Sequence, residues 1–396
     1  MPARSAHAGL WGLDPSVAFL NHGSFGACPR EVLEHQSALR ARMEAEPVDF
    51  FVRDLPGLYA AARESLAAFV HADPDDLAFV SNATSGVAAV LGSIALSPGD
   101  ELLTTDHAYA ACAKALHHAA ARSGARVVVA RVPFPLSGDD DVVAPILAAA
   151  TPRTRLALVD HVTSPTALVF PIERIVRELA ARGIDVLVDA AHALGMLPLD
   201  LDRVGAAYTV CNAHKWLCAP KGSAFLHVRR DRQATLHPHV ISHGYEPGAP
   251  AARFRDEFDW TGTCDPTPWL CVPEALRCIG AMLPGGWPAV MARNRALALD
   301  ARARVAAAIG ATLPAPAAMI GSMASLVLPT PAPGSSIARL DRVALGDAVR
   351  ARGVEAWFHP RPGGEGMLVR VSAQLYNDES QYAALGALLH ELARDA

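Results

Sequence analysis

The sequence predicts an α/β protein with a seven-stranded, mostly parallel sheet and a smaller α+β domain at its carboxyl end. Short apolar runs alternate with longer alanine-rich stretches, and the runs are apolar at nearly every position. That pattern is typical of strands covered by helices on both faces. The chain has 396 residues, 51% of them hydrophobic and 19% charged, so it is globular and too long for one small core.

The expected strands and helices alternate through the first two thirds of the chain. Strands are expected at 77–81, 101–105, 126–132, 155–162, 185–191, 207–212 and 223–228. Helices are expected between them, at 84–96, 108–123, 140–150 and 171–182.

Near the carboxyl end the pattern changes to a few strands between long helices. The helices are expected at 288–310, 337–353 and 379–396, and the strands at 323–329 and 367–374. We therefore divide the chain into an N-terminal segment near the active site (1–49), a large α/β domain (50–274) and a small α+β domain (275–396).

Composition excludes several classes of function. The net charge of −5 gives no basic surface for nucleic acid. No apolar run reaches the length of about 18 residues that a membrane helix needs, and no signal-peptide pattern opens the chain. The seven cysteines form no CxxC pair, so we expect free thiols and a cytoplasmic location. No metal site is expected, because the histidines at 237, 239 and 243 have no carboxylate or cysteine at ligand spacing.

Polar side chains follow the expected strands at the points where they end. They are Ser81 to Thr84, Asp106 and His107, His161 to Thr166, Asp189 to His192, and Asn212 to Lys215. In open α/β sheets, ligands bind at the carboxyl ends of the strands. The sequence therefore predicts a binding site at this edge of the sheet.

The stretch "SNATSGVAAV" has the form of a strand that turns at once into a helix. The backbone N–H groups of Ala83 and Thr84, with the Thr84 hydroxyl, could hold a phosphate at the helix N-terminus. An ordinary helix cap is the alternative. The two common glycine-rich nucleotide motifs, GxGxxG and GxxxxGK[ST], are absent.

Two charged residues stand at successive strand ends. A buried carboxylate such as Asp189 is costly unless it is paired, and a protonated pyridine nitrogen of a cofactor would pair with it. Capping of the next helix is the alternative. Lys215, preceded by Asn212 and His214, is placed to form a Schiff base, whereas most lysines simply lie at the surface. Lys221 precedes a turn glycine, and we expect it to be structural.

With these motifs the sequence resembles fold-type I pyridoxal-phosphate enzymes of the class V aminotransferase branch. The resemblance rests on the order of Thr84, His107, "VDAAH", "NAHKW" and "WTGTCD". The N-terminal "FLNHGSFGACPREVLE" and the late "LVRVSAQLYNDESQY" are similar to the isopenicillin N epimerase-like group within that branch. The resemblance covers about residues 18 to 390 and implies the PLP-dependent transferase fold.

The resemblance also implies pyridoxal 5'-phosphate as the cofactor and gives roles to the residues around it. Lys215 would form the Schiff base, Asp189 would hold the pyridine nitrogen, and His107 would stack on the ring, with Tyr109 as the competitor for that place. The residues implied for the ring hydroxyl are Ser164 and His192, and those implied for the phosphate are Ala83, Thr84, Asn212 and His214.

For the substrate, the resemblance implies that Arg370 binds the α-carboxylate. A salt bridge from Arg370 to Glu365 is the alternative. Asn21, His22 and Gly23 would form a loop over the substrate. Gly262 and Thr263 would reach the phosphate of a second subunit, which implies a homodimer with shared active sites.

The reaction implied by the resemblance begins with removal of the α-proton of an amino acid by Lys215. An epimerase or racemase is favoured, with Tyr109 as a candidate for return of the proton. A C–S lyase is the next alternative and an aminotransferase the third. A cysteine desulfurase is not expected, because "GVEAWFHPRPGGEGMLV" before Arg370 contains no cysteine. Intact Lys215, Asp189 and Arg370 argue against a non-catalytic scaffold, and the missing glycine motif argues against a nicotinamide-dependent enzyme.

Overall fold

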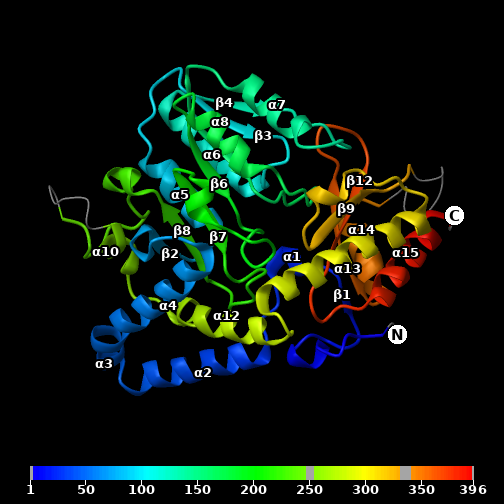
Figure 1. Ribbon diagram of the computed structural model, residues 1–396, viewed down its shortest axis with the longest axis horizontal. Helices are drawn as coiled ribbons and strands as arrows, with labels where there is room; N and C mark the ends of the chain where they lie inside the picture. Colours follow the sequence, from blue (N-terminus) through cyan, green and yellow to red (C-terminus); the bar gives the residue numbers. More distant parts are fainter. Residues whose placement is uncertain (1–2, 247–253, 331–339, 395–396) are drawn as a thin grey trace.

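The computed structural model describes residues 3–246, 254–330 and 340–394. Its centre is a seven-stranded sheet in the order β2-β8-β7-β6-β5-β3-β4 (Figure 1). The strands are β2 (Leu77–Val80), β3 (Glu101–Thr105), β4 (Arg126–Ala130), β5 (Thr154–Asp160), β6 (Asp185–Asp189), β7 (Tyr208–Asn212) and β8 (Ala224–Val228). β8 runs antiparallel to both of its neighbours, and every other pair is parallel. The predicted mostly parallel sheet is confirmed.

Helices cover both faces of this sheet, which explains why its strands are apolar at nearly every position. On β5, Leu156 and Leu158 pack into one core with helices α5 (Ala83–Ser93) and α6 (Ala110–Ser123). Ala157 and Val159, between them, pack into the opposite core. That second core includes α4 (Leu55–Val70), α7 (Asp140–Ala149) and α8 (Ile172–Ala180). Successive side chains of a strand point to opposite faces, so both sets are buried.

The small domain is built on an antiparallel sheet in the order β11-β12-β9. Its strands are β9 (Met323–Val327), β11 (Trp357–Pro360) and β12 (Met367–Ser372), and its helices are α13 (Gly286–Ile309), α14 (Arg342–Ala351) and α15 (Glu379–Arg394). The Asp341 side chain caps α14 by accepting from two backbone N–H groups. Part of the expected helix at 337–353, and most of the Pro-rich stretch before it, lie outside the described residues.

The N-terminal segment passes between the two lobes (Figure 1). Its strand β1 (Ala18–Phe19) pairs with β10 (Val354–Glu355) of the small domain, and the short helix α1 (His22–Phe25) follows. Helix α2 (Arg30–Ala45) then packs against α12 (Val272–Ala281). The segment therefore contacts both lobes.

Helix α12 also packs on α4, whereas α13 packs on α15. α12 thus lies with the large domain although it spans the boundary that we expected at 274, and the domain limits stay a prediction. The remaining short helices are α3 (Pro47–Asp49), α9 (Leu201–Val204), α10 (Phe254–Asp259) and α11 (Thr267–Leu270).

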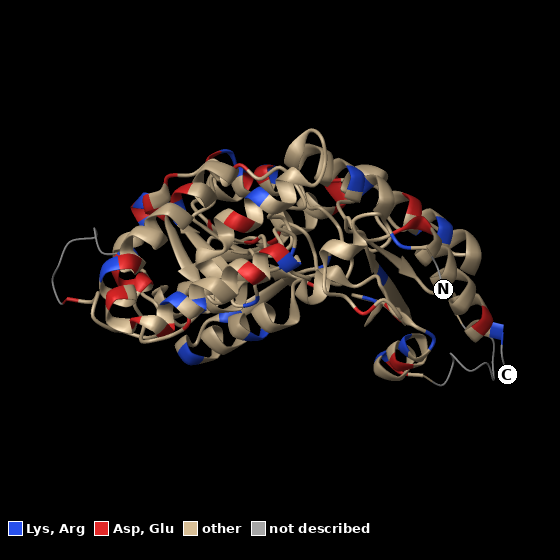
Figure 2. Ribbon diagram, turned by 90° about the horizontal axis from the view of Figure 1, so that it is seen from below, with Lys and Arg blue, Asp and Glu red and all other residues tan. Residues whose placement is uncertain are grey.

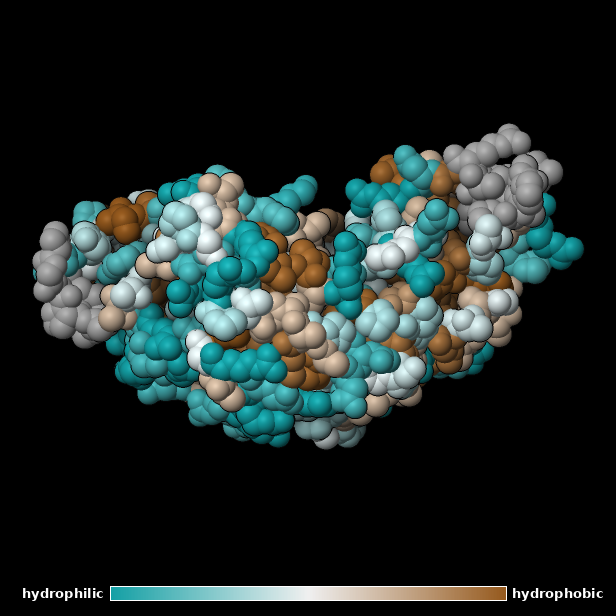
Figure 3. Space-filling view, turned by 90° about the horizontal axis from the view of Figure 1, so that it is seen from above, coloured by the Kyte–Doolittle hydropathy of each residue, from teal (hydrophilic) through white to brown (hydrophobic). Residues whose placement is uncertain are grey.

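The surface carries no large block of one charge sign in the view of Figure 2, where basic and acidic residues are interspersed. Figure 3 shows the surface notched between the two lobes. Among the described helices, none has both the length and the apolar composition needed to cross a membrane.

Candidate active site

The polar residues at the strand ends meet around one cavity of about 620 Å³. Most of the residues that the sequence singled out line it, namely Ala83, Thr84, Tyr109, Ser164, Asp189, His192, Asn212, His214 and Lys215. Further lining residues that were not expected as site residues from the sequence are Ser24, Phe25, Ser85, Asp160 and Gly222. The carboxyl edge of the sheet therefore forms a site, as the strand ends predicted.

Lys215 lies in the turn that follows β7, and its side chain is 9% exposed. Burial lowers the pKa of its amine to about 8, because desolvation disfavours the charged form; Asp189 opposes this shift and Arg370 adds to it. The turn is closed by a bond from the Cys218 N–H to the Lys215 carbonyl, 3.0 Å long, and Cys218 has a positive φ of 63°. An amine with this pKa exchanges its proton near neutral pH.

The N-terminal segment holds this turn from outside. The ring of His22 is fully buried, with Nε2 3.0 Å from the Lys215 carbonyl and Nδ1 2.8 Å from the Tyr376 hydroxyl. Gly26 lies so close that a Cβ built on it would stand 2.1 Å from the His214 carbonyl, and its φ is +70°. Only glycine fits there.

His192 lies against the lysine. Its Nε2 is 3.2 Å from Lys215 Nζ, and its Nδ1 accepts the indole N–H of Trp216 at 3.3 Å. Burial and the nearby Lys215 lower the pKa of His192 well below its ordinary value, so the imidazole is neutral.

Asp189 is buried at the end of β6. Its Oδ1 accepts the Ala191 N–H at 3.0 Å, and its Oδ2 accepts the Cys112 thiol at 3.4 Å. Burial raises the pKa of Asp189, and Lys215 partly offsets this rise. A cation bound in the cavity beside Asp189 would lower the pKa of this carboxyl group again, because an opposite charge favours the ionised carboxylate.

At the start of α5, the Asn82 side chain accepts the Ser85 N–H at 2.9 Å, so the ordinary cap is present. The Ala83 N–H donates to Asn212 Oδ1 at 2.8 Å and does not point freely into the cavity. His214 Nδ1 is 2.8 Å from the Ser223 carbonyl, and therefore carries the proton that bonds it. This end of the cavity combines a helix N-terminus with hydroxyl groups, which suits an anion.

His107 does not line the cavity, so the structure does not support the expectation that its ring stacks on the cofactor. Its Nδ1 accepts the Thr166 hydroxyl at 2.7 Å and its Nε2 donates to the Val132 carbonyl at 3.1 Å, in a fully buried position. Tyr109, two residues later, is 43% exposed and does line the cavity. Lys215 Nζ lies 5.9 Å from its ring centroid. Of the two candidates, Tyr109 is thus the ring that reaches the cavity, and its stacking on the cofactor stays a prediction.

Arg370 is a buried cation on β12 with neutral partners. Nη1 donates to the Ser164 carbonyl at 2.7 Å and to its hydroxyl at 3.2 Å. Nη2 donates to Asn21 Oδ1 at 3.3 Å and to Ser24 Oγ at 3.0 Å. Its Nε is buried without a partner, and among the described residues no carboxylate pairs with it; Glu365 is exposed. Burial lowers the pKa of Arg370 to about 10.

The loop expected over the substrate lies one to two residues further along the chain. Asn21 orients Arg370, and Gly23 donates its N–H to the Ser372 hydroxyl at 3.1 Å. His22 holds the lysine turn. Ser24 and Phe25 are the residues of this segment that line the cavity, and the Phe25 ring is exposed.

Gly262 and Thr263 lie apart from the cavity of their own chain, in an exposed loop after α10. Gly262 has a φ of +122°, and a Cβ on it would meet nothing within 4 Å.

Cys278, the nearest cysteine before Arg370, is buried, and burial raises the pKa of its thiol to about 12. Lys221 donates to the Gly26 carbonyl at 3.0 Å.

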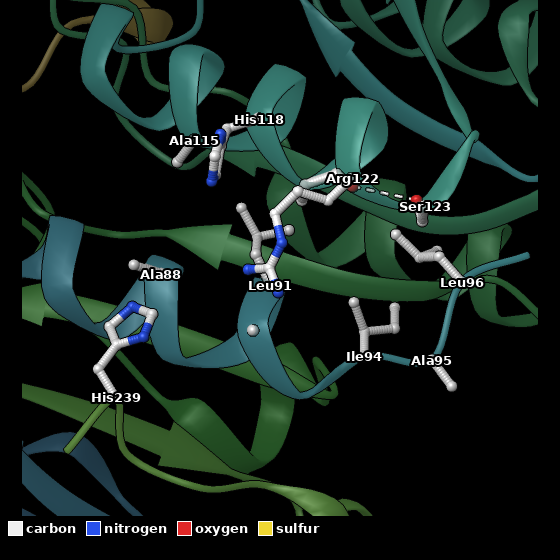
Figure 4. Close-up of a pocket in the computed structure, with 12 residues that line it drawn as sticks. Ala88, Leu91, Ile94, Ala95, Leu96, Ala115, His118, Arg122, Ser123 and His239 are labelled. Atoms are coloured by element: carbon white, nitrogen blue, oxygen red, sulfur yellow. Dashed lines mark hydrogen bonds between the residues drawn. The ribbon is translucent and has the colours of Figure 1, made fainter.

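A second hollow, of about 420 Å³, lies between α5 and α6. Figure 4 shows His118, Arg122 and His239 around it, with Leu91, Ile94 and Leu96 on its apolar side. It includes none of the strand-end residues. Among the described residues, no group of three His, Cys, Asp or Glu is placed to hold a metal ion.

Comparisons with known proteins agree with this geometry. The family model described as aminotransferase class-V matches residues 28–384. The chain is 37% identical to isopenicillin N epimerase of Streptomyces clavuligerus over 393 residues, which cover 96% of each protein. It is 35% identical to a putative L-cysteine desulfhydrase of Oryza sativa subsp. japonica, over 80% of this chain and 68% of the relative.

Among solved structures, the cystine C–S lyase C-DES superposes with a TM-score of 0.78 and 21% identity, covering 96% of this chain and 98% of the lyase. At that identity the likeness concerns the fold. The family match and the epimerase relative both extend over most of the chain. This protein therefore belongs to the aminotransferase class-V family of pyridoxal-phosphate-dependent enzymes.

Proposed function

We propose that this enzyme removes the α-proton of an amino acid and returns it on the opposite face, as an epimerase or racemase. The observation that carries the proposal is the arrangement of Lys215, Asp189 and Arg370. A buried amine with a pKa of about 8 and a buried carboxylate line one cavity. Arg370, which has no carboxylate partner among the described residues, lies behind the cavity wall, where it donates to the lining residues Ser24 and Ser164. The epimerase relative, similar over 96% of the chain, supports this reaction.

The residues present fit pyridoxal 5'-phosphate. Asp189 would hold the ring nitrogen, Tyr109 would face the ring, and the hydroxyl groups near the N-terminus of α5 would hold the phosphate. When bound, the cofactor draws electrons from the α-carbon of the substrate and so makes its proton acidic.

Three side chains of the protein would then bind the substrate and transfer its α-proton. Arg370 is the group to which we assign the substrate carboxylate. Its Nη donors are bonded to Ser164, Asn21 and Ser24, so the carboxylate would take the place of one or more of these neutral partners. Lys215 Nζ takes the α-proton, which suits a base whose pKa lies near the working pH. The Tyr109 hydroxyl is the group to which we assign return of the proton on the other face.

A C–S lyase is the second candidate. The cysteine desulfhydrase relatives support it, and the same Lys215 would remove the proton before a β-substituent leaves. Its product differs: β-elimination from a cysteine conjugate yields pyruvate, whereas epimerisation conserves the substrate. Transamination would yield a ketoacid and is third.

The deciding experiment incubates the enzyme with L-amino acids and cysteine conjugates in D₂O. We expect deuterium at the α-carbon together with inversion, seen by NMR and chiral chromatography. Pyruvate in proportion to consumed substrate would establish the lyase instead. A Tyr109→Phe variant should still exchange the α-proton but retain the starting configuration, and unchanged inversion in that variant would remove Tyr109 from the proposal.

We further propose a homodimer in which the loop around Gly262 and Thr263 reaches the partner's phosphate site. The exposure of this loop, apart from the cavity of its own chain, supports that arrangement. A cytoplasmic location is supported by the seven cysteines, all of which are free thiols.

A further inference from the structure

Two carboxyl groups, not one, stand at the bottom of the active-site cavity. Asp160 ends β5 and Asp189 ends β6, and their Cα atoms are register partners in the parallel ladder. Neighbouring strands lie about 4.8 Å apart, and register partners project from the same face. Both residues are almost fully buried and both line the cavity. Nothing in the mechanism above uses Asp160.

The two carboxyl groups are hydrogen-bonded unequally. Asp189 accepts one donor on each oxygen, from the Ala191 N–H and the Cys112 thiol. Asp160 Oδ1 is buried without a partner among the described residues. Asp189 is therefore bonded on both oxygens, whereas Oδ1 of Asp160 is a buried carboxyl oxygen that no donor of the described residues occupies and that can carry a proton.

The surroundings supply too little positive charge for two carboxylates. The titratable groups that face the pair are Lys215, Cys112, Cys211 and Tyr109. Lys215 is the one cation among them, and its own pKa is lowered to about 8. Burial first, and the like charge of Asp189 second, raise the pKa of Asp160 well above its ordinary value. The backbone N–H groups of Tyr109 and Ser164 act in the opposite direction but do not outweigh these two causes.

We propose that Asp160 is a neutral, protonated carboxyl group whose presence leaves the single negative charge of the pair on Asp189. Asp160 is then a positioning residue: it fills the polar floor of the cavity and keeps Asp189 as the one anion that meets the ring nitrogen. This role rests on the proposed cofactor orientation, whereas the protonation of Asp160 does not depend on which reaction the enzyme catalyses.

Infrared spectroscopy of the full-length protein as purified tests the protonation directly. A protonated carboxyl gives a C=O stretching band, which an ionised carboxylate lacks. We expect such a band at neutral pH. We expect the band to be absent from Asp160→Asn, so that it appears in the difference between the spectra of the unmodified protein and the variant. Asp185→Asn is the matched control, because Asp185 begins β6, the strand next to that of Asp160, and pairs with Arg232 at 2.7 Å. The control should leave the band in place.

Removing the neighbouring charge supplies a second test if Asp160→Asn fails to fold. In Asp189→Asn the like charge is gone, so the Asp160 band should titrate away at lower pH than in the unmodified protein. A spectrum of the unmodified protein without any protonated-carboxyl band at neutral pH would overturn the proposal. So would a band that persists in Asp160→Asn. Neither outcome depends on turnover, so a failure here is distinct from a failure of the proposed reaction.

Discussion

The indole N–H of Trp216 lies 3.3 Å from Nδ1 of His192, and Nε2 of the same imidazole lies 3.2 Å from Lys215 Nζ. An indole N–H can only donate, so Nδ1 must accept and the proton of the neutral imidazole is on Nε2. That proton points at the lysine. The amine can accept it only when the amine is itself neutral, so Trp216 favours the uncharged form of Lys215 through His192.

Replacing Trp216 by Phe should therefore raise the pKa of Lys215. Without the indole donor, His192 can carry its proton on Nδ1 and present Nε2 as an acceptor to the ammonium. We expect the pH midpoint for covalent capture of pyridoxal phosphate, followed by absorbance, to rise by about one unit, or about 1.4 kcal/mol. Trp11→Phe is the control: it removes another buried indole bond, to the Ala27 carbonyl at 3.3 Å, and should leave the midpoint where it was.

Lys215 should be the residue that borohydride joins to the cofactor. We expect peptide mapping of the reduced protein to place the adduct in the peptide with Lys215, and Lys215→Ala to abolish it. Lys221→Ala, which removes the other lysine of this segment, should still form the adduct. An adduct on Lys221 in the unmodified protein would reverse the assignment.

Replacing Arg370 by Lys should weaken the binding of amino acids much more than the binding of amines that lack a carboxylate. A buried cation whose described partners are all neutral lacks a counter-charge, which a substrate carboxylate would supply in exchange for one of those partners. A lysine cannot copy the two parallel bonds of a guanidinium. We expect binding of an amino acid to weaken by about 2–5 kcal/mol, with a much smaller loss for its decarboxylated analogue, in spectroscopic titrations.

The control is Arg302→Lys, because Arg302 is also buried but donates to the Ala315 carbonyl far from the cavity. It should change neither titration. Equal losses for both ligands in Arg370→Lys would mean that Arg370 serves the fold.

The raised pKa of Asp160 should also make the free energy of unfolding depend on pH. Its pKa is raised in the folded protein, so the folded state holds this proton more tightly than the unfolded chain does. The resulting stabilisation is fully present below the unfolded pKa of about 4 and is lost as the pH rises through the folded pKa. Asn cannot ionise and so does not lose this stabilisation. As the pH rises, the free energy of unfolding of Asp160→Asn should therefore increase relative to that of the unmodified protein. Urea unfolding at a series of pH values measures this, and parallel curves would count against a raised pKa.

Hybrid dimers test the shared site. Lys215→Ala lacks the base, and Thr263→Asp should repel the phosphate of the partner. Each protein should be inactive alone, but mixed dimers would contain one site with both residues intact. We expect recovered activity after verified subunit exchange; its absence would show that each chain completes its own site.

Much of the fold could be predicted because the sheet strands, apart from the edge strand β4, are buried on both faces and so leave unbroken apolar runs. The antiparallel direction of β8 could not be placed from that pattern, since a strand buried on both faces looks the same in either direction. The short connection from Asn212 to Ala224, which holds no helix long enough for a crossover, was the available signal.

The sequence predicted which residues line the cavity where these residues stand directly at strand ends. It predicted them less well where the direction of a side chain determines whether it faces the cavity. His107 and Tyr109 both follow β3, and the turn between them determines which ring faces the cavity. Asp160 was overlooked because a carboxyl group at the end of an apolar strand shows its importance only beside Asp189, across the ladder. Trp216 acts through a contact that no spacing in the sequence reveals.

The path of the N-terminal segment has a consequence for how the protein comes into being on the ribosome. Asn21 donates to Glu355 at 3.3 Å and accepts from Arg370, partners that are synthesised more than three hundred residues later. The large domain can be complete while the nascent chain is still growing, but Arg370 does not meet Asn21 until residue 370 has itself been synthesised and has emerged. The site around Arg370 is therefore assembled late in translation, because it joins segments that are made far apart in time.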